Sequence, residues 1–211
     1  MLHDLWRSGL SEKNLNFAGF KCRAIVHRTA GVPIVFLHGF SYTCAVWERI
    51  GVTTLLEEKH VPFLALDMPY GMKSECQPRS RSSEKNVAFA REAVSEAFGD
   101  HAPVLVGASI GGHIALKYAS LHLVKGLLLV APGRALDPDL AESYPKFKFP
   151  VRIIWGTEDN IISGEDMRIL SEKLPNAKLV TYQGAGHSAY LSQPEKFKRD
   201  LLELYAGAES G

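Results

Sequence analysis

The sequence lacks an excess of charge of either sign. Its 24 lysine and arginine residues nearly match its 23 aspartate and glutamate residues, which leaves a formal net charge of +1 at pH 7. A protein that neutralises many phosphates needs a basic excess, so this balance argues against a nucleic-acid partner. The densest basic stretch, RSRSSEK at residues 79–85, has Glu75 and Glu84 close by, and we interpret it as a solvated loop.

Long hydrophobic runs are also missing. The longest, LLLVA at residues 127–131, is far shorter than the roughly 20 residues that span a bilayer. We therefore expect no membrane segment. Residues 1–14 have neither the basic region nor the apolar region of a secretory signal. These absences make the cytoplasm the expected location.

Cysteine is scarce. Cys22, Cys44 and Cys76 are odd in number, widely spaced and without a C-x-x-C pair. This pattern offers no zinc site and is typical of free thiols in a reducing compartment. We accordingly expect free thiols, no metal and no cofactor.

What the chain does contain is a regular alternation of short β-branched runs with amphipathic helical runs. Its 211 residues, 46% hydrophobic and 22% charged, suit one soluble domain over residues 1–211. The expected strands are 20–27, 32–39, 61–69, 102–108, 124–132, 151–156 and 177–184, and the expected helices are 45–60, 84–99, 111–122, 165–174 and 194–207. This order predicts an α/β fold with a mostly parallel, doubly wound sheet and helices on both faces.

The stretch GASIGG at residues 107–112 has a strand pattern before it and a helix pattern after it. This is the nucleophile-elbow pattern, in which small residues at Gly107 and Gly111 relieve collisions around a strained serine. A phosphate-binding loop would need Gly-Lys-Ser/Thr, which is absent. We interpret Ser109 as a nucleophile, with a plain turn as the alternative.

A serine hydroxyl needs a general base, and the base needs a group that orients it. His187 follows the last expected strand in GAGHSAYL, and Asp159 follows the preceding one in GTEDN. Glu158 is a weaker alternative for the acid. The chain order Ser109, Asp159, His187 is that of α/β-hydrolases rather than of chymotrypsin or subtilisin.

The segments LHGF, LDMPYGMKS, GASIGG, GTEDN and GAGHSAYLSQPEKF resemble the signature segments of α/β-hydrolases over residues 20–206. More narrowly, the chain is similar to the small lidless hydrolases of the abhydrolase-14 type. The resemblance implies esterase-type activity on small acyl substrates. It also implies an oxyanion hole made by the backbone N–H groups of Phe40 and Ile110, with His38 shaping the loop that carries Phe40.

One segment departs from the family pattern. Where D-x-P-G-x-G-x-S is usual, this chain has DMPYGMKS at residues 67–74. We expect Asp67 still to tie this turn together. The bulkier side chains placed here are candidates for one wall of the substrate pocket, with packing against the loop after Pro78 as the alternative. The candidate substrate-binding residues are Tyr42, Tyr70, Met72 and Tyr190, and Phe40 is a further candidate wall.

The segment where many α/β-hydrolases insert a lid is short. Residues 132–149 hold three prolines and are too few for a cap domain. We therefore predict an open site with no lid.

The prediction from sequence is a serine hydrolase that cleaves small acyl esters through a Ser-His-Asp triad and an acyl-enzyme intermediate. The same residues are compatible with a thioesterase or a cofactor-free perhydrolase. A non-catalytic ligand-binding or interaction protein on the same fold is a further alternative. The only partner we expect is a small-molecule acyl substrate, and the sequence does not determine the oligomeric state.

Overall fold

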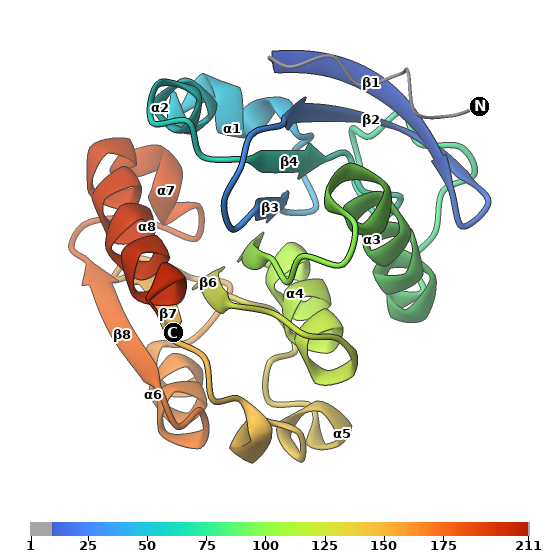
Figure 1. Ribbon diagram of the computed structural model, residues 1–211. Coiled ribbons are helices and arrows are strands. Elements are labelled where there is room, and N and C mark those ends of the chain that lie inside the picture. The colour runs from blue at the N-terminus through green and yellow to red at the C-terminus, as the bar shows by residue number, and fades with distance from the viewer. Residues whose placement is uncertain (1–9, 211) are drawn as a thin grey trace.

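The computed structural model describes residues 10–210 and is organised around one eight-stranded sheet (Figure 1). The strands are β1 (Leu10–Phe17), β2 (Phe20–His27), β3 (Ile34–Leu37), β4 (Phe63–Leu66), β5 (Val104–Ala108), β6 (Gly126–Val130), β7 (Val151–Gly156) and β8 (Ala177–Tyr182). The helices are α1 (Ala45–Arg49), α2 (Val52–Glu58), α3 (Ser83–Phe98), α4 (Ile110–Leu121), α5 (Pro138–Ala141), α6 (Gly164–Lys173), α7 (Ala189–Ser192) and α8 (Pro194–Glu209), with a short 3₁₀ turn, η2 (Tyr144–Lys146). Most of the segment interpreted as lacking a secretory signal lies outside the described residues.

The strand order is β1-β2-β4-β3-β5-β6-β7-β8. The strands from β4 to β8 in this order pair in parallel, and only β1 and β2 are antiparallel additions at one edge. The chain moves outward from β3 in one direction and then returns to place β5 on its other side. In such sheets, sites form where the order reverses, beyond the carboxyl ends of the strands. The loops after β3 and β5 meet at this point.

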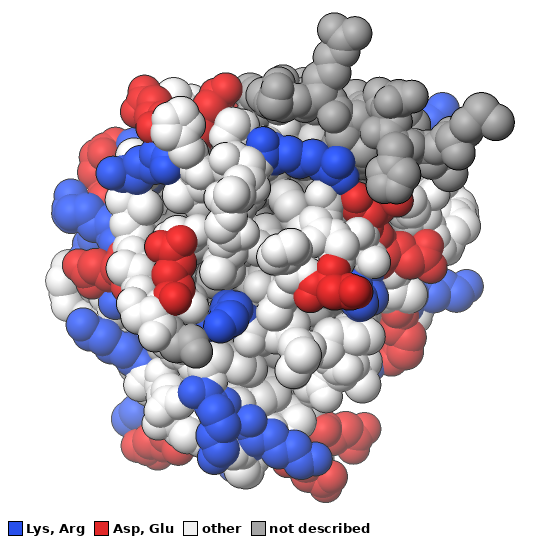
Figure 2. Space-filling view, viewed as in Figure 1, with Lys and Arg blue, Asp and Glu red and all other residues white. Residues whose placement is uncertain are grey.

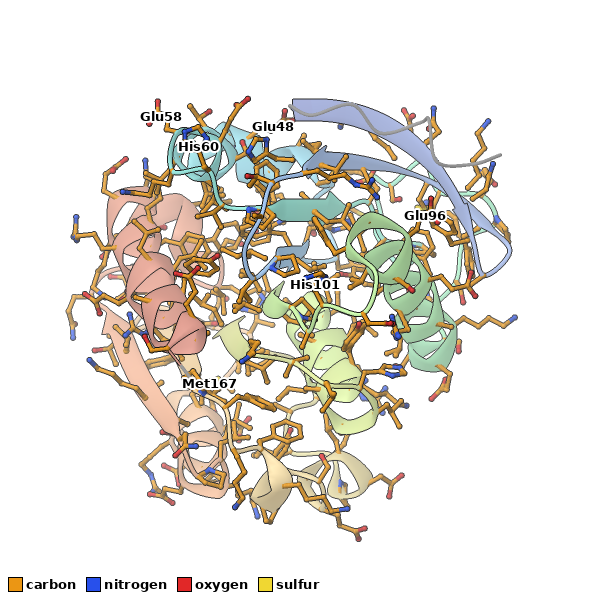
Figure 3. All side chains as sticks on the ribbon, viewed as in Figure 1. Glu48, Glu58, His60, Glu96, His101 and Met167 are labelled. Carbon is orange, nitrogen blue, oxygen red and sulfur yellow. A yellow bond between two sulfur atoms is a disulfide. The ribbon has the colours of Figure 1, made fainter. Side chains whose placement is uncertain are left out.

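Helices cover both faces of the sheet (Figure 1). Successive side chains along β3 point to opposite faces of the sheet and enter two different hydrophobic clusters. Val35 and Leu37 belong to the first cluster, and Ile34 and Phe36 belong to the second. The first cluster includes residues of α3, α4 and α6, such as Met167, whose place on α6 is labelled in Figure 3. The second includes residues of α1, α2 and α8. The predicted doubly wound α/β fold is confirmed.

Three local features differ from the prediction or refine it. Strand β1 was not expected, because LSEKNLNF has few apolar residues. The helix expected over 45–60 is two helices, since Gly51 takes a left-handed conformation with φ of 70° between them. Between β6 and β7 the chain forms only α5 and η2, so the structure has no lid there, as predicted.

The prediction of free thiols is wrong for two of the cysteines. A disulfide joins Cys22 of β2 to Cys76 in the loop after β4, across 54 positions of sequence. An isolated β-bridge between Lys21 and Gln77 holds the same two segments together. The sequence could not predict this disulfide, because Cys22 and Cys76 are far apart along the chain and only the fold brings β2 and the loop after β4 together. Cys44 is free and buried. The expectation of a reducing compartment rested on three free thiols, and two of them form a disulfide.

Charge is distributed without a dominant sign. Figure 2 shows basic and acidic side chains interspersed around the rim of one face, in agreement with the net charge of +1. Within residues 10–210, no helix combines the length and the apolar character needed to cross a bilayer.

Candidate active site

The turn between β5 and α4 places Ser109 in an unusual backbone conformation. Its φ of 53° and ψ of −116° lie outside the regions that a non-glycine residue ordinarily occupies, and such strain costs of order 1–3 kcal/mol. Hydrogen bonds hold the residue there. The Ser109 N–H donates to Val130 O at 2.9 Å, and Ser109 O accepts from the N–H groups of Gly112 and Gly133, both at 3.0 Å. The surrounding structure thus stabilises a sharp elbow.

Glycines allow this elbow to lie against its neighbours. A Cβ on Gly111 would lie 2.2 Å from Leu37 O, and a Cβ on Gly107 would lie 2.5 Å from Gly111 O. Both distances are far below any real contact, and both involve backbone that cannot move aside. The glycines at 107 and 111 therefore permit the close approach expected from the sequence. As a result, the end of β3 packs directly against the start of α4.

His187 and Asp159 come from the loops after β8 and β7. His187 Nδ1 lies 2.8 Å from Asp159 Oδ2, and the Asp159 side chain is fully buried while that of His187 is 18% exposed. Asp159 Oδ1 accepts from the N–H groups of Ile161 and Ile162, at 2.8 and 3.0 Å. A carboxylate can only accept, so Nδ1 carries the proton and Nε2 is left as an acceptor.

The structure distinguishes the two candidate acids. Glu158 is exposed and makes no side-chain contact with the imidazole, whereas Asp159 bonds to it. The two loops meet closely because Gly156 has no side chain, since a Cβ there would lie 2.2 Å from Ala185 O. The Glu158 N–H donates to Ala185 O at 2.9 Å, which fixes the contact. The neighbouring position at 159 then faces His187.

Ser109 and His187 line the same open hollow, which has a volume of about 380 Å³. No hydrogen bond between these two side chains is present in the described chain, and such bonds commonly tighten only when substrate is bound. The other lining residues are Gly39, Phe40, Ser41, Tyr42, Ala108, Ile161, Ser188 and Tyr190. Phe40 and Ile161 are 41% and 65% exposed. The hollow is thus wide open at its rim.

Two backbone N–H groups, one in the loop after β3 and one directly after Ser109, have no internal acceptor. In the described part of the chain, the N–H groups of Phe40 and Ile110 donate to no backbone or side-chain group. A Cβ built on Gly39 would lie 3.8 Å from Ser109 Cβ, so the loop that carries Phe40 passes beside the serine. The Met72 N–H donates to Phe40 O at 2.7 Å and fixes this loop from behind. Unpaired N–H groups of this kind can bind an oxyanion.

His38 has a structural role in the same loop. The Met68 N–H donates to His38 Nε2 at 2.9 Å, so the proton is on Nδ1, which donates to Gly39 O at 2.8 Å. The ring is fully buried, and burial lowers the pKa of His38 below its ordinary 6.5, although Gly39 O and Asp67 oppose the shift. Asp67 also ties this turn, as expected, by accepting from the Cys44 N–H at 2.7 Å.

This burial predicts a loss of stability in mild acid. In the folded protein the His38 ring is neutral, whereas in the unfolded chain it takes up a proton below about pH 6.5. Its contribution to the free energy of unfolding is therefore fully present above that pH, and it decreases as the pH falls toward the lowered pKa of the folded state. We expect the free energy of unfolding, measured with urea, to fall between pH 7 and pH 5. His38→Gln, which does not titrate, should be less stable at pH 7 but have a smaller slope. An equal slope in both proteins would contradict this assignment.

The four candidate pocket residues divide between two hollows. Tyr42 and Tyr190 line the hollow of Ser109 and His187. Tyr70 and Met72 do not line that hollow, so their expected role as walls of the substrate pocket stays a prediction. They line a second hollow of about 410 Å³, and Phe40 lines both. Tyr70 is held away because its hydroxyl donates to His38 O at 2.6 Å.

Several residues that line the Ser109 hollow were not anticipated, among them Ser41, Ser188 and Ile161. Ser188 lies within hydrogen-bond distance of Tyr42, with 3.1 Å between the hydroxyl oxygens, and Ile161 stands at the exposed rim. In the sequence, only their closeness to triad candidates could have indicated them, since Ser188 follows His187 and Ile161 is two residues after Asp159.

The remaining histidines of the described chain lie elsewhere, and His3 is outside the described residues. Figure 3 labels His60, near the end of α2, and His101, which precedes β5. Both are exposed and come before strands, whereas the site lies beyond the carboxyl ends of strands. His113 is buried on α4 and lies 3.0 Å from the Ser83 hydroxyl. Among residues 10–210, no group of three or more His, Cys, Asp or Glu side chains is arranged to hold a metal ion.

Comparisons with known proteins give consistent results. A family described as the alpha/beta hydrolase family matches residues 34–152, more than half of the chain. Protein ABHD14A of Danio rerio is 32% identical over 177 residues, which cover 82% of this chain but 64% of that protein. The chain thus spans less than two thirds of this relative. The human protein named "Putative protein-lysine deacylase ABHD14B" is 26% identical over 85% of this chain and 86% of its own.

A solved structure shows the same fold. The structure described as a "predicted CIB-like hydrolase" from Thermoplasma acidophilum superposes with a TM-score of 0.82 at 21% identity, over 93% of this chain and 98% of the other.

Proposed function

Because this chain belongs to the alpha/beta hydrolase family, we propose that it is a serine hydrolase that cleaves small acyl esters through Ser109, His187 and Asp159. The observation that carries the proposal is the convergence of three loops on one hollow. The imidazole of His187 lies 2.8 Å from the buried carboxylate of Asp159. His187 and the strained Ser109 line the same hollow.

The proposed reaction has two steps. His187 Nε2 takes the proton of Ser109 Oγ, which attacks the acyl carbon, and the N–H groups of Phe40 and Ile110 stabilise the oxyanion. His187 then gives the proton to the leaving oxygen, the bond from the acyl carbon to that oxygen breaks, and an acyl-enzyme remains. Water activated by His187 hydrolyses the acyl-enzyme and regenerates Ser109.

The open hollow bears on the substrate. A volume of about 380 Å³ is near the lower end for ligand sites, which favours short acyl groups. The absence of a lid between β6 and β7 leaves room for a bulky leaving group. This openness, with the name of the relative ABHD14B, supports a second candidate function, the removal of acyl groups from protein lysines.

A fluorophosphonate probe, together with a panel of 4-nitrophenyl esters from acetyl to dodecanoyl, tests the proposal. We expect the probe to label the wild type and not Ser109→Ala, and kcat/KM to be highest for short acyl groups. An acyl-lysine peptide, a thioester and a peroxide-dependent halogenation assay separate the deacylase, thioesterase and perhydrolase alternatives. A folded wild type that the probe does not label would favour a binding protein instead.

A further inference from the structure

A second hollow shares Phe40 with the Ser109 hollow, and it carries two arginines. Its lining residues are Phe40, Pro69, Tyr70, Met72, Arg79, Ser80 and Arg81. Apolar side chains and arginines thus line one depression, and no acidic residue of the described chain lines it. The sequence alone suggested a solvated loop here.

The two arginines are not neutralised within the molecule. Neither Arg79 nor Arg81 forms an ion pair or a side-chain hydrogen bond within residues 10–210. Arg81 also lines the neighbouring hollow, whose lining includes Glu84, Asp137 and Asp139. Two of these carboxylates already have cationic partners, because Asp137 pairs with Arg134 at 2.7 Å and Glu84 pairs with Lys117. The arginines at 79 and 81 therefore keep their donors for an external anion.

The backbone between these arginines is fixed. The Ser80 N–H donates to Pro69 O at 3.1 Å, and Ser80 O accepts from Asn86 Nδ2 at 3.0 Å. The disulfide at Cys76 anchors the same loop to β2. Because the loop is held on both sides, the backbone of Arg79 and Arg81 starts from a defined position, which lowers the entropy cost of ordering this loop on binding.

The proposed chemistry indicates which part of the substrate reaches this hollow. The leaving oxygen must lie near His187, and His187 lines the Ser109 hollow but not the second one. The acyl chain leaves the reacting carbon on the side away from His187. Phe40, whose N–H is a proposed oxyanion donor, lines both hollows.

We propose that the second hollow is an acyl-chain subsite in which Arg79 and Arg81 bind a carboxylate at the far end of the acyl group. The favoured substrates are then monoesters or monoamides of dicarboxylic acids. Met72 and Tyr70 contact the methylene groups of such a chain, while the guanidinium groups pair with its carboxylate in the forked geometry that arginine favours. This inference rests on the proposed function and specifies its substrate class.

Matched substrates test the proposal. The 4-nitrophenyl monoesters of adipic and suberic acid are compared with isosteres that carry a carboxamide in place of the free carboxylate. For the wild type we expect kcat/KM to be about ten-fold higher for the acids, mainly through KM, because two exposed charge pairs contribute modestly. In the double variant Arg79→Gln with Arg81→Gln this ratio should fall to near one. Raising the salt concentration should reduce it in the wild type.

Arg199→Gln is the matched control. Arg199 is exposed on α8 and its loss changes the net charge without touching the hollow, so the wild-type ratio should persist. An unchanged ratio in the double variant, or an equal loss in Arg199→Gln, would overturn the proposal. Acetyl esters of 4-hydroxybenzoate and 4-hydroxybenzamide test whether the enzyme prefers a carboxylate on the leaving group instead. A higher kcat/KM for the 4-hydroxybenzoate ester would also overturn the proposal.

A binding experiment separates this proposal from the proposed function. Calorimetric titration of Ser109→Ala with adipate and with hexanoate compares ligands that differ only by the distal carboxylate. We expect tighter binding of adipate, and loss of the difference when both arginines are replaced. If no ester is hydrolysed but the difference is found, the hydrolase proposal fails and the subsite stands. If the difference is absent, the subsite is refuted.

Discussion

Ser109→Ala is expected to lower kcat for ester hydrolysis by about 10⁴-fold or more, by comparison with the loss of a triad residue in a protease. The variant has no hydroxyl to form the acyl-enzyme, and the donors at Phe40 and Ile110 can only stabilise a direct attack by water. Steady-state hydrolysis of 4-nitrophenyl acetate measures the loss. Urea unfolding should show little change, because alanine has the same backbone strain at φ of 53° as serine.

Ser188→Ala is the control for this effect. Ser188 also lines the Ser109 hollow, but its hydroxyl is within hydrogen-bond distance of Tyr42. We expect its loss to lower kcat far less than the loss of Ser109. If Ser109→Ala keeps most of its turnover, the nucleophile is another residue and the proposed mechanism is wrong.

Asp159→Asn is expected to lower kcat by about 10⁴-fold, the size of the effect that the equivalent change has in a serine protease. The structure gives a specific reason. Asp159 Oδ1 accepts from two backbone N–H groups, at 2.8 and 3.0 Å, so the oxygen of an asparagine must stay on that side. Its NH₂ group then faces His187 Nδ1, which becomes an acceptor, and the proton moves to Nε2. The imidazole can no longer take the proton of Ser109.

Glu158→Gln is the matched control, since it changes an adjacent, exposed carboxylate in the same loop. We expect its kcat to stay close to that of the wild type. The two variants are compared by kcat and by the pH dependence of the rate. A large loss in Glu158→Gln with a small one in Asp159→Asn would reverse the assignment of the acid.

The fold and the three triad candidates were accessible from sequence because each rests on a local pattern. The glycines at 107 and 111 flank a serine between a strand and a helix, and the structure shows that backbone stands where their side chains would be. The parallel topology then brings the loops of Asp159 and His187 to the same end of the sheet. Local residue patterns and the general topology of parallel sheets were therefore sufficient to predict the fold and to nominate the three triad candidates.

Other features depend on which distant segments meet, and the sequence carries little signal for them. The partnership of Cys22 with Cys76 requires the pairing of β2 with the loop after β4. Tyr70 does not line the Ser109 hollow, because its hydroxyl bonds to His38 O, a contact that no spacing predicts. The significance of Arg79 and Arg81 depends on the absence of an ion pair between either guanidinium group and a carboxylate of the described chain. The acidic residues nearby in sequence suggested the opposite.

The Cys22–Cys76 disulfide has a consequence for how the molecule behaves when it unfolds. It closes a covalent ring across 54 positions of sequence, which limits the disorder of the denatured chain and by the chain-entropy account adds about 4 kcal/mol to stability. The loop of Phe40 lies inside this ring, while Ser109, Asp159 and His187 lie outside it. A reducing buffer is therefore expected to lower the thermal stability of the protein while leaving the three proposed triad residues chemically unchanged.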